Sequence, residues 1–79
     1  MKYHNMDKVG RKSLLLGAIK SVRHSVRFTQ TDMALYLGLL PSAYSRTEGG
    51  TRKLTADEFI QILELVRSDL IKDITGTLV

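Results

Sequence analysis

The side chains of this sequence that could take part in chemistry are mainly Lys and Arg, whose chemistry is the binding of anions. Residues 1–53 carry ten Lys or Arg against three Asp or Glu, a formal charge of +7. Residues 54–79 carry two Lys or Arg against five acidic residues, a formal charge of −3. One end of the protein should therefore present a basic surface suited to a polyanion such as nucleic acid, and the other end should not.

Residues for catalysis or for metal binding are scarce. The chain has no Cys, and its two His, His4 and His24, are too few and too far apart to form a metal site. We interpret His24 as a helix-end residue beside favourable carbonyls. The acidic residues of the C-terminal third have no neighbouring nucleophile or base, and we interpret them as a solvated face. These are Asp57, Glu58, Glu64, Asp69 and Asp73. We therefore expect no enzyme activity, no cofactor and no metal.

Length and hydropathy indicate one small cytoplasmic domain. Seventy-nine residues lie near the lower limit for a self-sufficient core, so a partner subunit could stabilise the C-terminal end. The longest apolar run, residues 14–19, is interrupted by Gly17 and is far too short to span a membrane. Residues 1–10 lack the apolar segment of a secretion signal. We expect a soluble cytoplasmic protein with no membrane partner.

The N-terminal region is predicted to be a mobile arm followed by a helix. Residues 1–11 are polar and show no apolar periodicity, so we expect a flexible arm there. Leu15, Ile19, Val22 and Val26 then follow the spacing of the apolar stripe of an amphipathic helix. Ser13 is a candidate for the residue that caps this helix.

Two short helices are predicted next. Residues 29–32 match a capping box, in which the Thr29 hydroxyl accepts from the amide of Asp32 while the carboxylate accepts from the amide of Thr29. This helix should end at Gly38, which can adopt the left-handed conformation of a helix end. Pro41 is tolerated at the first position of the following helix. That helix should run to about Glu48 and end at the glycines that follow it.

The last helix is predicted to begin at a second capping box, residues 55–58. Two alternatives remain for its end, because no Gly or Pro occurs before Gly76: one long helix, or a break near Ser68 and a short fifth helix. The side chains predicted to point inward are Phe59, Ile62, Leu63 and Val66. No strand pattern is present, so we predict an all-α fold of four to five helices. Residues 12–67 form its main domain, and residues 68–79 form a C-terminal helical extension.

The spacing within residues 29–50 is typical of a helix-turn-helix. A steep crossing of two helices over a short turn needs a small residue at the crossing and a glycine in the turn, which Ala34 and Gly38 supply. Apolar residues should seal the pair against the remaining helices, and these are Met33, Leu37, Leu39 and Tyr44. The second helix then presents a short polar face that could enter a major groove, consisting of Ser42, Ala43, Ser45 and Arg46.

Residues 13–66 resemble the lambda-repressor-like helix-turn-helix family, also called Cro/repressor or XRE-like domains. The resemblance is carried by the "TQ" at Thr29, Ala34, the "LG" at Leu37, the "SR" at Ser45, Glu48, Gly50 and the "TRK" at Thr51. It implies that Gln30 binds a DNA phosphate and supports the recognition helix, and that Arg46 makes a bidentate contact with guanine. It also implies a partly buried ion pair between Arg23 and Glu48. The DNA-binding residues that it implies are Gln30, Pro41, Ser42, Ala43, Ser45, Arg46, Thr51, Arg52 and Lys53.

The sequence departs from the family pattern at three places. Tyr44 and Thr47 stand where branched aliphatic residues are usual, and Leu40 and Pro41 replace the usual polar start of the recognition helix. Arg27 occupies a position that is often glycine, so some backbone strain is expected there. These departures leave the recognition helix few groups that can read bases, so DNA shape is expected to contribute to specificity.

Two functional hypotheses follow. The first is a sequence-specific transcriptional regulator that binds a palindromic operator in double-stranded DNA as a homodimer. Among regulators, we favour a repressor. Its dimer interface would use the apolar residues left over at the C-terminus, which are Leu70, Ile71, Ile74, Leu78 and Val79. The alternative is a protein-interaction module, an antitoxin-like or anti-repressor adaptor built on a helix-turn-helix scaffold. The basic surface favours the first.

Overall fold

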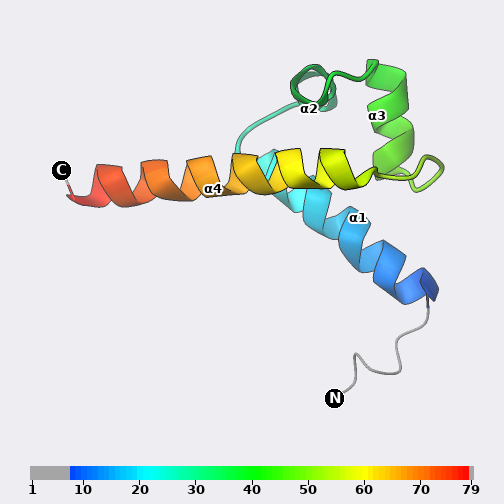
Figure 1. Cartoon of the computed structure of the whole chain (residues 1–79), viewed down its shortest axis with the longest axis horizontal. Helices are drawn as coiled ribbons and strands as arrows, with labels where there is room; N and C mark the ends of the chain where they lie inside the picture. The colour runs from blue at the N-terminus through cyan, green and yellow to red at the C-terminus, as the bar shows by residue number, and fades with distance from the viewer. Residues whose placement is uncertain (1–7, 79) are drawn as a thin grey trace.

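The computed structural model describes the backbone of residues 8–78 and the side chains of residues 10–76. It contains four helices in the order α1 (Lys8–Ser25), α2 (Gln30–Leu37), α3 (Pro41–Glu48) and α4 (Ala56–Leu78), and this part of the chain has no strand. The predicted all-α class is therefore confirmed. Helices α2 and α3 lie together beside the N-terminal end of α4, and the C-terminal part of α4 extends past the other helices (Figure 1).

The predicted capping boxes define the starts of α2 and α4. At α2, the Asp32 amide donates to Thr29 Oγ1 at 3.1 Å and the Thr29 amide donates to Asp32 Oδ2 at 2.8 Å. At α4, the Glu58 amide donates to Thr55 Oγ1 at 3.1 Å and the Thr55 amide donates to Glu58 Oε1 at 3.0 Å. Each box satisfies two backbone amide donors that a helix start would otherwise leave unpaired.

Helix α1 begins earlier than the sequence analysis expects. It starts at Lys8, so residues 8–11 of the predicted arm are helical, whereas residues 1–7 lie outside the described part of the chain. Ser13 consequently lies inside the helix and is not its cap. Extending an existing helix costs little once the first turn has formed, and Lys and Arg are good helix formers, so apolar periodicity alone places this boundary too late.

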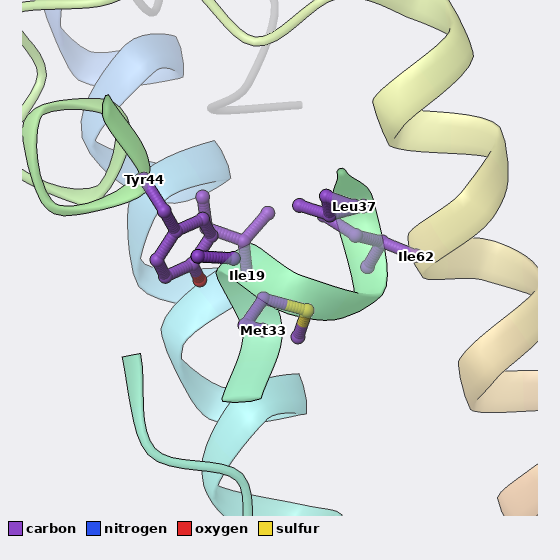
Figure 2. Close-up of a cluster of buried hydrophobic side chains, with 6 residues drawn as sticks. Ile19, Met33, Leu37, Tyr44 and Ile62 are labelled. Carbon is purple, nitrogen blue, oxygen red and sulfur yellow. The ribbon is translucent and has the colours of Figure 1, made fainter. Parts of the chain in front are cut away.

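The core lies where α1, α2, α3 and α4 meet. Its buried apolar side chains are Ile19, Met33, Ala34, Leu37, Tyr44 and Ile62, and Figure 2 shows most of them pointing toward one another. Partly buried side chains pack around this cluster, among them Leu16 and Val22 of α1. Leu15, predicted to point inward, is 37% exposed, and Leu16 contacts the core in its place. The remaining residues of the predicted α1 stripe, Ile19, Val22 and Val26, are buried or half-buried as expected.

Helix α4 is continuous, so the alternative with a break near Ser68 is wrong. Its inward face also differs from the prediction: Ile62 is buried, but Phe59, Leu63 and Val66 are 39–50% exposed. Glu58 and Leu65 pack inward with Ile62. The prediction was wrong because α4 carries apolar residues on two faces, and periodicity cannot tell which one meets the domain. In the described part of the chain, no helix has the length and apolar content needed to cross a bilayer.

Candidate nucleic-acid interface

The turn between α2 and α3 fixes the direction of α3. Three residues, Gly38, Leu39 and Leu40, join the two helices. Gly38 has φ 72°, in the left-handed region that favours glycine, and the Leu39 amide donates to the Ala34 carbonyl at 2.8 Å. Ala34 is completely buried, so a larger side chain would not fit at this crossing. The small residue and the glycine therefore occupy the positions that the sequence pattern predicts.

A buried carboxylate connects α3 to α1 and α2. Arg23 Nε of α1 donates to Glu48 Oε2 at 2.6 Å, and a second guanidinium nitrogen donates to Oε1 at 3.2 Å. The Tyr44 hydroxyl donates to Glu48 Oε2 at 2.5 Å, and Gln30 Nε2 of α2 donates to Oε1 at 3.1 Å. The expected Arg23–Glu48 ion pair is thus present, and Gln30 supports the end of α3. We call Arg23, Gln30, Tyr44 and Glu48 the Glu48 network.

The charges of this network are stabilised by its hydrogen bonds. Burial alone would raise the pKa of Glu48, but the hydrogen bonds from Arg23, Tyr44 and Gln30 outweigh it and hold this pKa below its ordinary value. The pKa of Arg23 is raised chiefly by its hydrogen bond to Glu48. Burial also raises the pKa of Tyr44, so its hydroxyl remains a donor at neutral pH. Among the described residues, no buried side-chain nitrogen or oxygen lacks a hydrogen-bond partner.

The opposite face of α3 is open to solvent. Ser42, Ser45 and Arg46 are exposed together with Pro41, and Ala43 is half-buried. Arg46 Nε makes a long hydrogen bond of 3.4 Å to the Ser42 carbonyl. Two of the departures from the family pattern, Tyr44 and Thr47, lie on the inner face, where Thr47 is fully buried and its hydroxyl donates to the Ala43 carbonyl at 3.0 Å. Helix α3 therefore has one face that anchors it and one short polar face available to a ligand.

The loop after α3 is braced by Arg52. Its guanidinium donates to both carboxylate oxygens of Glu58, at 2.9 and 3.0 Å, and to Thr47 Oγ1 at 3.0 Å. The hydrogen bond from Arg52 lowers the pKa of Glu58, whose side chain is buried and not part of a solvated face as the sequence analysis expected. Thr51 and Lys53, the other two residues of the predicted phosphate-binding loop, are exposed. Arg52 thus holds this loop on α4, and Lys53 is the cation that the loop presents.

Two contacts of this loop were not predicted from the sequence. Glu58 closes the capping box of residues 55–58 and lies only six residues after Arg52, so this short separation was a local signal for their ion pair. Lys12 of α1 donates from Nζ to the Gly50 carbonyl at 2.6 Å, although 38 residues separate them in the chain. Its position on the same helix face as Leu16, four residues later, is the only local signal for this contact. A cavity of about 230 Å³ lies between Lys12, Leu15, Leu16, Arg52, Lys53 and Leu54.

Arg27 adopts the strained conformation that its position suggests. Its φ is 61°, the only positive value among the non-glycine residues in the described part of the chain. The Arg27 amide donates to the His24 carbonyl at 3.0 Å, which closes α1 before the chain turns into α2. An arginine in this conformation costs energy that glycine would not, so the link between α1 and α2 is held by the packing on either side of it.

The residues predicted for the dimer interface lie apart from α3. Leu70, Ile71 and Ile74 are exposed on the C-terminal part of α4, whereas the Leu78 side chain and Val79 lie outside the described residues. In the described part of the chain, no group of His, Asp and Glu side chains is arranged to hold a metal ion. Comparison with protein-family models, with curated proteins and with solved structures found no significant match.

Proposed function

We propose that this protein is a sequence-specific DNA-binding transcriptional repressor with a lambda-repressor-like helix-turn-helix, acting in the cytoplasm as a homodimer on a palindromic operator. The observation that carries the proposal is the division of α3 into two faces. Tyr44, Thr47 and Glu48 are buried, while Ser42, Ser45 and Arg46 are exposed to solvent. A helix held rigidly by one face can present the other to base edges in a major groove.

The surrounding residues would bind the DNA backbone. Lys53 and Thr51 follow α3 in the loop braced by Arg52, which suits them to contact phosphates beside the groove. Gln30 Nε2 donates one of its two amide hydrogens to Glu48, and the second hydrogen can still donate to a phosphate. We therefore assign Gln30 both to the support of α3 and to phosphate binding, together with Thr51 and Lys53. Base contact is assigned to Arg46, whose guanidinium can donate to both acceptors of a guanine.

The decisive experiment selects bound sites from a randomised DNA pool and then measures affinity by fluorescence anisotropy. Arg46→Ala should weaken binding to the selected site by about 1 to 3 kcal/mol and relax the preference at one base position. Lys72→Ala is the control, because it also removes one positive charge from an exposed position on α4. Equal effects of the two variants on affinity and on sequence preference would contradict the assignment of α3 as the recognition helix.

The electrostatic part of the proposal has its own test. If a dimer neutralises roughly 6 to 10 phosphates, affinity should fall by about 10³ to 10⁵-fold between 50 and 200 mM salt. Lys53→Ala should weaken binding to all sequences about equally and make the salt dependence shallower. An affinity that does not change with salt would contradict backbone binding by the basic residues.

A second candidate function is the protein-interaction module. It is favoured by Leu35 and Leu40, large apolar side chains that are 81% and 72% exposed at α2 and at the turn before α3. An adaptor that binds protein through this surface would lose its partner in the variant Leu35→Ser with Leu40→Ser. In a DNA-binding repressor, the same double variant would retain its selected operator with nearly unchanged affinity. Measurements on this one double variant therefore distinguish the two functions.

A further inference from the structure

Helix α4 carries an exposed apolar stripe along most of its length. Its members recur at the spacing of one helix face and are each 39–57% exposed. The stripe consists of Phe59, Leu63, Val66, Leu70 and Ile74, with Ile60 and Ile71 on one flank. Apolar periodicity predicts the first three inside the domain and only the last two, with Ile71, at an interface. The structure joins them into one continuous surface, which we call the α4 stripe.

The size of this surface points to a second copy of the chain as its occupant. Seven side chains that are about half exposed leave on the order of 600 Å² of apolar surface on each subunit, which is the upper end of what monomers typically expose. Two such stripes in contact would bury on the order of 1,200 Å², the lower limit for a stable interface. The stripe matches itself in length and in chemistry, as a two-fold symmetric contact requires. It is also continuous with the interface of the proposed homodimer.

We propose that two copies pair their α4 stripes in antiparallel orientation, and that the position of the stripe sets the distance between the two DNA-binding faces. The proposal rests on the function proposed above and adds the direction and the reach of the dimer. Its midpoint lies between Val66 and Arg67, halfway along the stripe. In this arrangement, Phe59 of one subunit lies near Ile74 of the partner subunit.

The faces of α4 favour the antiparallel orientation. Glu58, Ile62 and Leu65 pack against the domain, and successive residues turn by about 100°, so this side lies roughly 120° around the helix from the stripe. An antiparallel pair has its two-fold axis perpendicular to both helices, which leaves both domains on the same side of the pair. A parallel pair has its axis along the helices and would place the domains on opposite sides. Only the antiparallel pair directs both α3 helices toward one face of a duplex.

The distance along α4 agrees with this orientation. Helix α3 lies beside the N-terminal end of α4 (Figure 1). About ten residues separate Ala56 from the midpoint of the stripe, which is about 16 Å at a rise of about 1.5 Å per residue. The two-fold axis doubles this distance to about 32 Å. Successive major grooves on one face of B-DNA are roughly 34 Å apart, so the pairing brings the two recognition helices to adjacent turns.

The orientation is tested with spin labels, because the chain has no native Cys. Ile60→Cys, Arg67→Cys and Ile74→Cys are seven residues apart and lie on one side of the helix, so the three labels differ mainly in their distance from the proposed midpoint. Antiparallel pairing predicts a short distance between the two labels at position 67, and distances at positions 60 and 74 that are longer by about 20 Å. Three equal distances would show a parallel pair and overturn the proposal.

The extent of the interface is tested by sedimentation equilibrium. Leu63→Asp should weaken dimerisation on the order of 100-fold, as should Leu70→Asp, because each buries two charges in the contact. Ser68→Asp, which adds the same charge on the opposite side of α4, should leave the dimer unchanged. If Leu63→Asp dimerises like the parent, the interface does not extend to the N-terminal half of the stripe and the proposal is wrong. A parent protein that remains monomeric would also overturn it.

These measurements are made without DNA, so they separate the pairing from the proposed function. An antiparallel dimer that binds no selected site would retain the pairing and contradict the function. A dimer that binds a selected site but shows three equal label distances would retain the function and contradict the antiparallel pairing. If both stand, inserting about half a helical turn, about 5 bp, between the half-sites should reduce affinity to that for a single half-site, because the second α3 then faces away from its groove.

Discussion

The α2–α3 unit and the C-terminal part of α4, residues 70–76, are both helical, yet only the first contributes side chains to the core. In the α2–α3 unit, a capping box, a left-handed glycine and the Glu48 network define the ends of the helices. In α4, every residue from 70 to 76 is exposed, and none belongs to the core. Short helices without packing are marginal in water. The first region is therefore held by packing within the chain, whereas the second offers an exposed surface to the second copy that we propose.

Between these two regions, we expect the largest difference in unfolding free energy for substitution of Glu48. Glu48→Ala leaves Arg23 buried without its carboxylate, so the free energy of unfolding should fall by about 3 kcal/mol in urea denaturation. Glu64→Ala breaks the exposed pair with Arg67 on α4 and should cause no measurable change. Tyr44→Phe removes one hydrogen bond of the network and should cost about 1 to 2 kcal/mol, which provides a milder variant. Similar losses for Glu48→Ala and Glu64→Ala would remove the distinction between the two regions.

Truncation of apolar side chains on α4 should depend on which face they occupy. Ile62→Ala opens a cavity in the core and should cost about 2 to 4 kcal/mol at any protein concentration. Leu70→Ala removes a side chain that is exposed in the monomer, so its cost should be small in dilute solution and grow with protein concentration. Thermal denaturation at two concentrations a hundredfold apart measures both effects. A concentration-independent loss for Leu70→Ala would mean that this residue packs within its own subunit.

Two glycines should respond to alanine with opposite signs. Neither Gly38 nor Gly17 has another atom near the position of an added Cβ, so only backbone conformation distinguishes them. Gly38→Ala places a side chain at φ 72° and should destabilise the protein by about 1 kcal/mol. Gly17→Ala replaces a glycine inside α1 and should stabilise it by about 0.5 to 1 kcal/mol. A stabilising Gly38→Ala would mean that the turn does not need its left-handed residue.

Acid should destabilise the capped and ion-paired region through its carboxylates. The pKa values of Glu48 and Glu58 lie below the ordinary value of 4.5 in the folded protein. Their contribution to stability is therefore complete above pH 4.5 and is lost as the pH falls through the lower folded-state values. The difference in unfolding free energy between the parent and Glu58→Gln should shrink as the pH decreases from 6 to about 3. A difference that grows over this range would have the wrong sign for a depressed pKa.

The features that sequence could predict are those with a local cause. The capping boxes at Thr29 and Thr55 and the turn at Gly38 each depend on residues within a few positions of one another, and all three are present. The division of α3 into a buried face and an exposed face likewise follows from its short amphipathic pattern. The expected ion pair joins Arg23 to Glu48 over 25 residues, and it came from resemblance to a family and not from spacing.

The features that sequence could not predict depend on where whole helices lie. Phe59, Leu63 and Val66 are as apolar as Ile62 but lie on another side of α4. The position of the other helices decides which side is buried. The brace between Arg52 and Glu58 and the contact of Lys12 with Gly50 are likewise tertiary. The start of α1 at Lys8 was missed for a different reason, because those residues are helical without an apolar stripe to mark them.

The two faces of α3 also have a consequence for how such a protein can change. Ser42, Ser45 and Arg46 make no contact with the core, whereas Tyr44, Thr47 and Glu48 make almost none with solvent. Substitutions on the outer face are therefore nearly free of a penalty in folding, and they can accumulate without loss of the scaffold. A library randomised at the three outer positions should yield folded proteins in most of its members. The outer face of α3 can therefore diverge quickly while the architecture of the protein stays fixed.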